Sequence, residues 1–204
     1  MRGFFMRHPE IINAIGGTPL LPIERLASHV PDGVTVLAKA EFMNPGGSVK
    51  DRPAWAMIRE GLKSGQLNAQ TTLLDATSGN TGIAYAMIGA AVGFRVHLAI
   101  PENASRPRQR LLEALGAELF LTDPVEGTDG AQMHVRRLIE RNRDRYFYPD
   151  QYNNDANWLS HFETTGAEII EQTEGKVTHF VAALGTTGTL IGVSRRLKQD
   201  LTNA

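Results

Sequence analysis

Residues 72–122 read TLLDATSGNTGIAYAMIGAAVGFRVHLAIPENASRPRQRLLEALGAELFLT, and this stretch decides the fold. Three short runs that start 23 positions apart predict strands over Thr72–Asp75, Arg95–Ile100 and Glu118–Thr122. Between them, apolar residues recur at helical spacing over Asn80–Val92 and Ser105–Leu115. Strands that alternate with helices indicate right-handed βαβ units. The sequence therefore predicts an α/β protein built on a parallel sheet.

The flanking parts of the chain predict fewer elements. Upstream we expect a helix with Ser48 as its N-cap, preceded by strands over Leu20–Ile23 and Val34–Ala40. The turn-forming cluster Pro149–Asp155 predicts a domain boundary. The elements expected after it are a helix over Asp155–Glu171, a strand over Val177–Ala183 and a helix over Leu190–Leu197. These are too few for an independent parallel-sheet domain, so we expect an unusually compact chain or a fragment.

Composition excludes several classes of function. The 204 residues include 21 basic and 22 acidic side chains, and a formal net charge of −1 gives no electrostatic argument for nucleic acid. Because there are no cysteines, a disulfide scaffold, a thiolate metal site and a cysteine nucleophile are excluded. The six histidines show no metal-ligand spacing, although His97 and His179 are expected to lie in strands. Acidic residues interrupt the basic run between Arg136 and Arg145, which indicates a solvated helix face.

No segment predicts a membrane or secretory role. The longest apolar stretch, Ile83–Val92, is shorter than the roughly 18 residues that a membrane-spanning helix needs. The N-terminal stretch Met1–Arg7 has too little apolar content for a signal peptide. We therefore expect a cytoplasmic protein without a membrane partner.

The first candidate for chemistry is residues 44–52, which read NPGGSVKDR. If Ser48 caps the helix, Lys50 lies in its first turn, where the positive end of the helix dipole disfavours a cation by about 0.3–1 kcal/mol. The same field would lower the pKa of the amine and favour a nucleophile. The alternative is a solvated lysine paired with Asp51.

Two further candidates lie where a predicted strand meets a predicted helix. Residues 77–82, TSGNTG, combine glycines, hydroxyls and free helix N–H groups that can form a cup for a small anion. Residues 185–189, GTTGT, have the ingredients of a phosphate cradle, although they match neither G-x-x-x-x-G-K-[ST] nor G-x-G-x-x-G. For both segments the alternative is a tight, capped turn without a ligand.

A nucleophilic lysine, an anion cup and a phosphate cradle together suggest pyridoxal phosphate, which needs a Schiff-base lysine and a phosphate anchor. With these motifs in this order, the sequence resembles the fold-type II pyridoxal-phosphate enzymes, specifically the cysteine synthases (O-acetylserine sulfhydrylases). The matching stretches run from Ile15–Leu20 to Gly192–Arg195. The GTTGT loop resembles the B type, since the A type generally has glycine in place of Thr187. Gly46–Gly47 also resembles cystathionine β-synthase.

The resemblance implies a role for each matching residue. Lys50 would form the Schiff base and carry the proton at the substrate Cα, and Asn80 would hydrogen-bond the ring hydroxyl of the cofactor. The residues that would bind the cofactor phosphate are Gly185, Thr186, Thr187, Gly188 and Thr189. The residues that would hold the substrate carboxylate are Thr77, Ser78, Gly79, Thr81 and Gln151. No metal site is expected.

The resemblance also implies an activity and an architecture. A homodimer would replace the β-substituent of O-acetylserine, or a related activated serine, with sulfide or thiosulfate to give cysteine or S-sulfocysteine. The alternatives are cystathionine β-synthase or serine/threonine dehydratase activity, or a non-catalytic truncated homologue.

The implied fold consists of parallel three-layer α/β/α domains. Residues 44–150 would form the smaller domain, and residues 1–43 plus 151–204 part of the larger, cofactor-binding domain. Family members are longer, so the C-terminal remainder of the larger domain is expected to be absent. The 204-residue chain alone is accordingly expected to be a poor enzyme.

Overall fold

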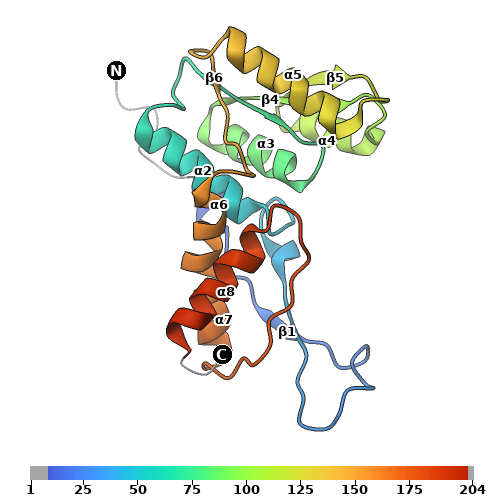
Figure 1. The fold of residues 1–204 in the computed structure, drawn as a ribbon, viewed down its shortest axis with the longest axis vertical. Helices are drawn as coiled ribbons and strands as arrows, with labels where there is room; N and C mark the ends of the chain where they lie inside the picture. The colour runs from blue at the N-terminus through green and yellow to red at the C-terminus, as the bar shows by residue number, and fades with distance from the viewer. Residues whose placement is uncertain (1–8, 202–204) are drawn as a thin grey trace.

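The structure is a computed structural model that describes residues 9–201, with a helix-flanked sheet at one end and packed helices at the other (Figure 1). The stretch Met1–Arg7 lies outside the described residues, so the expectation for it stays a prediction. None of the helices within residues 9–201 combines the length and the apolar character that crossing a membrane requires.

Four parallel strands form the central sheet. They are β3 (Thr72–Ala76), β4 (Arg95–Pro101), β5 (Glu118–Thr122) and β6 (Tyr146–Phe147), in the order β5-β4-β3-β6. β3 is buried along its whole length, as expected for an inner strand of a sheet that is covered on both faces. The predicted parallel sheet is confirmed.

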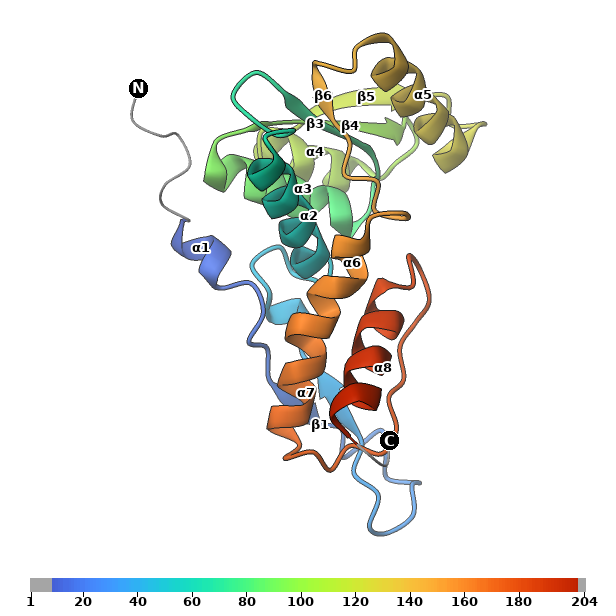
Figure 2. The same cartoon turned by 60° about the vertical axis from the view of Figure 1, so that its left-hand side comes forward.

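Helices cover both faces of this sheet. They are α2 (Asp51–Ser64), α3 (Asn80–Val92), α4 (Arg106–Ala114) and α5 (Gly127–Arg141). α5 lies on one face, and α2, α3 and α4 lie on the other (Figures 1 and 2). Successive side chains of a strand point to opposite faces, so Leu73 packs in the core with α3 and Leu74 in the core with α5. The three-layer α/β/α arrangement is confirmed.

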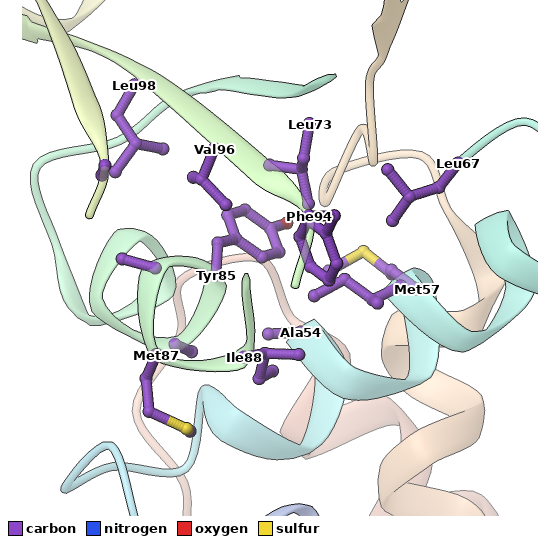
Figure 3. Packing of buried hydrophobic residues seen from close by; sticks show 14 of the residues in the cluster. Ala54, Met57, Leu67, Leu73, Tyr85, Met87, Ile88, Phe94, Val96 and Leu98 are labelled. Atoms are coloured by element: carbon purple, nitrogen blue, oxygen red, sulfur yellow. The ribbon is translucent and has the colours of Figure 1, made fainter. Parts of the chain in front are cut away.

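The core on the α3 side is closely packed (Figure 3). Tyr85 of α3 is fully buried, and its ring lies among Phe94, Val96 and Met57. α3 has no polar face, because it lies between α2 and the sheet. Gly93 ends this helix in the left-handed conformation (φ 94°), which lets the chain turn directly into β4.

The remaining elements form the second part of the molecule. β1 (Leu20–Pro22) pairs antiparallel with β2 (Leu37–Lys39), and the others are α1 (Glu10–Asn13), the 3-10 helix η1 (Glu41–Met43), α6 (Asp155–Ser160), the π-helix η2 (His161–Thr165), α7 (Gly166–Gln172) and α8 (Gly188–Asp200). α6, η2 and α7 form one continuous helical stretch, and α8 packs alongside it (Figure 2). The two helices expected after the predicted boundary are therefore confirmed.

One predicted strand is wrong. Residues 177–183 have no regular secondary structure, so His179 does not lie in a strand, and Val181 is 90% exposed. A strand needs a neighbour that satisfies its backbone N–H and C=O groups. Within residues 9–201 no strand pairs with this segment. The predicted strand over Val34–Ala40 is present but shorter, since only Leu37–Lys39 pair with β1.

Candidate functional site

Lys50 occupies the N-cap position of α2, which begins at Asp51. The expectation that Ser48 is the N-cap and that Lys50 lies in the first turn is therefore wrong by two residues. The Ser48 carbonyl accepts the Asp51 N–H at 3.3 Å, which closes a separate turn. The α-helical hydrogen bonds start with the Ala54 N–H, which donates to the Lys50 carbonyl at 3.0 Å. Ser48 still supports this turn, because its Oγ accepts the Lys50 N–H at 3.2 Å.

The Lys50 amine is partly buried at this helix N-terminus. Burial lowers the pKa of the amine, because desolvation disfavours the charged form. No ion pair joins Lys50 to Asp51 in the described part of the chain. The pairing of Lys50 with Asp51 that the alternative required is therefore not found among the described residues. A lysine of lowered pKa supplies the neutral amine that nucleophilic chemistry requires.

Asp51 fixes the turn that precedes Lys50. Its side chain is buried, and burial raises the pKa of its carboxyl to about 6, although Oδ2 accepts the Gly46 N–H at 2.5 Å. A Cβ atom on Gly46 would lie 2.5 Å from Asp51 Oδ1, which is closer than real Cβ contacts, so a larger residue would displace the Asp51 carboxyl. The backbone on the N-terminal side of Lys50 is thereby held in one position.

The loop 77–82 leaves β3 at its carboxyl end and becomes α3 at Asn80. The N–H of Gly79, the N-cap residue, donates to Thr77 Oγ1 at 3.2 Å. Asn80 is exposed and Ser78 is partly exposed. The loop therefore presents polar groups and a helix N-terminus to solvent, which is an arrangement that can bind an anion.

Gln151 reaches this loop from a distant part of the sequence. The Thr81 Oγ1 donates to Gln151 Oε1 at 3.1 Å, and both residues are buried. The structure thus brings together two of the residues to which the resemblance assigns the substrate carboxylate.

The loop 185–189 leads into α8, which begins at Gly188. Thr187 has φ 66°, a left-handed conformation that β-branched residues rarely adopt, and such strain persists only where surrounding contacts hold it. Asn157 holds this conformation, because it contacts the residues on both sides of Thr187. The Asn157 Nδ2 donates to Thr186 Oγ1 at 2.9 Å, and a Cβ atom on Gly188 would lie 2.1 Å from Asn157 Oδ1.

His161 contacts the same loop one helical turn after Asn157. Its Nε2 lies 3.2 Å from Thr189 Oγ1, and its Nδ1 lies 2.9 Å from Thr165 Oγ1. Burial, with the nearby Arg52 and Lys50 cations, lowers the pKa of the imidazole to about 4. The ring is therefore neutral at physiological pH, and Lys50 lies near enough to affect its charge.

One hydrogen-bonded network therefore connects two of the three segments that the sequence singled out, residues 77–82 and 185–189. Asn157 donates to the Gln151 carbonyl at 2.7 Å as well as to Thr186, and Gln151 bonds Thr81. His161 extends the network to Thr189, and the charge of Lys50 in the third segment makes a small contribution to the lowered pKa of its imidazole. The site can hold an anion at the N-terminus of α3 and another at that of α8. Residues 9–201 contain no group of three or more His, Cys, Asp or Glu that could hold a metal ion.

Asn157 and His161 are functional candidates that the sequence did not predict. They are 5% and 1% exposed, and they lie four positions apart on one helical stretch. Two polar residues on the buried stripe of an amphipathic helix were a signal that could have found them. The π-helix that carries His161 is a second sign, since such turns are frequent at functional sites, but it has no sequence signature.

The chain matches a known family over nearly its whole length. The family model described as pyridoxal-phosphate dependent enzyme matches residues 11–204. The chain is 52% identical to a cysteine synthase of Aquifex aeolicus over 189 residues and 43% identical to a cysteine synthase B of Pseudomonas aeruginosa over 195 residues. These matches cover 92% and 96% of this chain, which spans 58% and 64% of the two relatives.

A solved structure agrees with these matches. The crystal structure of a cysteine synthase (OASS) from Entamoeba histolytica is similar with a TM-score of 0.89 at 40% identity. The match covers 93% of this chain and 56% of that one. The similarity therefore includes both the sheet and the helices that carry the candidate site.

Proposed function

Because the chain belongs to the family of pyridoxal-phosphate dependent enzymes, we propose that it serves a cysteine synthase-type transferase reaction. In this reaction sulfide replaces the acetoxy group of O-acetylserine, which gives cysteine and acetate. The names of the relatives support this choice of substrate class. The observation that carries the proposal is the hydrogen-bonded network that joins loop 77–82, Gln151 and loop 185–189.

Pyridoxal phosphate fits the residues that are present. The lowered pKa of Lys50 favours the neutral amine that condenses with an aldehyde. The start of α8 offers backbone N–H groups, and a Cβ atom on Gly185 would meet nothing within 4 Å, so a phosphate has room to approach. The residues we assign to the phosphate are Gly185, Thr186, Thr187, Gly188 and Thr189, with Asn80 at the ring hydroxyl. When bound, the cofactor supplies the electron sink for the reaction.

The protein residues bind the substrate and move its proton. Loop 77–82 and Gln151 hold the α-carboxylate through hydroxyl, amide and helix N–H donors. The residues assigned to this task are Thr77, Ser78, Gly79, Thr81 and Gln151. Lys50 removes the proton at Cα, and burial moves the pKa of its amine toward the range in which a lysine acts as a base. Acetate leaves from Cβ, the sulfur nucleophile adds at the same carbon, and Lys50 returns the proton to Cα.

The proposal extends to finer points. Thiosulfate is a second sulfur donor, with S-sulfocysteine as its product, and the protein works as a cytoplasmic homodimer. Residues 44–150 form the smaller domain, and residues 1–43 plus 151–204 belong to the larger one. The separate cores of the sheet region and of α7 with α8 support this division. α1 does not fit this division, because it belongs to residues 1–43 but packs on α3 of the smaller domain.

Reductive labelling tests the assignment of Lys50. The protein is loaded with pyridoxal phosphate, reduced with borohydride and mapped by peptide mass. We expect one reduced adduct, on Lys50, which disappears in Lys50→Arg and persists in the matched control Lys63→Arg at the other end of α2. Lys39 is expected to remain unlabelled, because its ammonium pairs with Glu168 at 2.6 Å. Labelling of Lys39 or Lys63 in place of Lys50 would refute the assignment.

Product analysis tests the reaction. The intact protein is incubated with the cofactor, O-acetylserine and sulfide, and cysteine and acetate are expected in equal amounts. Lys50→Ala should lower the rate by on the order of 10²–10⁴-fold, the usual contribution of a proton-transfer group. Pyruvate as the main product, or cystathionine formed in preference to cysteine when homocysteine is added, would point to a different reaction.

A further inference from the structure

Asn157 lies between the two segments proposed to bind different ligands. It is 5% exposed, and its amide nitrogen donates to the Gln151 carbonyl at 2.7 Å and to Thr186 Oγ1 at 2.9 Å. An amide nitrogen carries two hydrogens, so each acceptor has one of its own. Gly188 packs directly against the same amide, where a Cβ atom would lie 2.1 Å from Oδ1. Both segments are therefore fixed by a single side chain.

The helix holds Asn157 in place. Asn154 caps α6 by accepting the Ala156 N–H at 2.9 Å, and the Asn157 N–H donates to the Asn154 carbonyl at 3.0 Å. The Ser160 hydroxyl donates to the Asn157 carbonyl at 2.7 Å. A buried amide hydrogen without an acceptor is costly, so Asn157 tends to keep both of its hydrogen bonds. A displacement of Gln151 or Thr186 therefore shifts the Asn157 amide and, through it, the other residue.

The polarity of these bonds extends to both ligand positions. Because the Thr186 oxygen accepts from Asn157, its own hydrogen is directed elsewhere and can be donated to an anion in loop 185–189. Because Gln151 Oε1 accepts from Thr81, its Nε2 hydrogens remain to be donated to a carboxylate. Thr186, Asn157, Gln151 and Thr81 are thus joined by three consecutive hydrogen bonds, of which Asn157 donates two and Thr81 donates one.

We propose that Asn157 is a positioning residue that couples the two binding loops, so that a phosphate held at residues 185–189 places Gln151 for the substrate carboxylate. The inference rests on the proposed function, which puts the phosphate and the carboxylate in these two places. It predicts that a change in the phosphate loop reaches the amino-acid position only through Asn157.

A double-mutant cycle tests this coupling. Thr186→Val removes the hydroxyl, Asn157→Ala removes the amide, and the affinities for pyridoxal phosphate and for L-serine are measured by absorbance on the wild type, both single variants and the double variant. Binding of inorganic phosphate to the cofactor-free protein, followed by thermal shift, gives a readout independent of turnover. We expect Thr186→Val to weaken L-serine binding about fivefold, the effect of one hydrogen bond, although Thr186 is not assigned to the carboxylate. In the Asn157→Ala background the same change should have less than a twofold effect.

Thr164→Val is the matched control. It removes a hydroxyl of the same helical stretch, which donates to the Ser160 carbonyl at 2.6 Å, and it contacts neither loop, so it should leave both affinities within twofold. Additive effects in the cycle would overturn the coupling. Thr186 is partly exposed, so Thr186→Val is expected to fold even if Asn157→Ala does not. An unchanged L-serine affinity in Thr186→Val would by itself overturn the coupling. An absent Lys50 adduct in the wild type would refute the proposed function, whereas a normal adduct with additive effects would refute the coupling alone.

Discussion

Asp75 is a buried carboxyl group that stands two residues before loop 77–82, and it is 2% exposed. Its Oδ1 accepts the Ala76 N–H at 2.7 Å, and the hydroxyl of the fully buried Tyr85 of α3 interacts with the same carboxyl group. Burial raises the pKa of this carboxyl to about 6. The folded protein therefore favours the neutral acid, and ionisation of Asp75 opposes folding.

This raised pKa predicts how Asp75→Asn changes stability with pH. The pKa of Asp75 in the folded protein lies above the ordinary value of 3.8. The contribution of the neutral Asp75 carboxyl to stability is therefore complete below pH 3.8 and is lost as the pH rises through about 6. Asparagine keeps an acceptor for Ala76 and does not ionise. We expect it to raise the free energy of unfolding by on the order of 2–3 kcal/mol at pH 8 and to have little effect at pH 4. Urea denaturation checks this, with exposed Asp144→Asn as the control. A difference that does not change with pH would contradict the raised pKa.

At the scale of elements, the sequence predicts what local periodicity determines. The strands and helices of residues 72–122 were predictable, because each buries a face against the same sheet and its pattern records that burial. The strand over 177–183 was not, because strand formation depends on a partner that its own residues do not specify. The contacts of Asn157 were also hidden, since Thr186 lies 29 positions away.

The packing of α8 on the α6–η2 stretch depends on Gly192. A Cβ atom there would lie 2.2 Å from the Trp158 carbonyl oxygen and 2.7 Å from His161 Cβ. Gly192→Ala is therefore expected to lower the free energy of unfolding by about 1–3 kcal/mol, despite the higher helix propensity of alanine. Thermal denaturation measures the change. Lys198→Ala, at an exposed site of the same helix, should stay within about 0.5 kcal/mol. Equal or greater stability of Gly192→Ala would show that the helices are not in backbone contact.

At the scale of the whole molecule, a buried ion-pair network joins the sheet region to the helices at the other end. Arg52 of α2 donates to both carboxylate oxygens of Glu41, at 2.8 Å each, and to those of Glu168 on α7, at 2.6 and 2.8 Å. Lys39 of β2 also pairs with Glu168 at 2.6 Å. Although burial raises it, the bonds from Arg52, Lys39 and the Gly17 N–H lower the pKa of Glu168 to about 2.

Arg52→Gln is expected to weaken this connection in a pH-dependent way. At pH 7 it leaves two carboxylates without their main partner, so the free energy of unfolding should fall by about 3–5 kcal/mol. The folded pKa of Glu168 lies below its ordinary value of 4.5, so its stabilising contribution is present above pH 4.5 and is lost as the pH falls toward 2. Arg52→Gln has less of this contribution to lose. The difference in the free energy of unfolding between the variant and the wild type should therefore become smaller in acid.

The matched control lies on the same helix. Arg59 is 3.8 Å from Glu163, and the two side chains are 45% and 59% exposed. Solvent screens such a pair, so Arg59→Gln should change stability by less than about 0.5 kcal/mol at either pH. Urea denaturation of both variants at pH 7 and pH 3 makes the comparison. Equal losses for Arg52→Gln and Arg59→Gln would mean that the helices and the sheet region are held together by apolar packing alone.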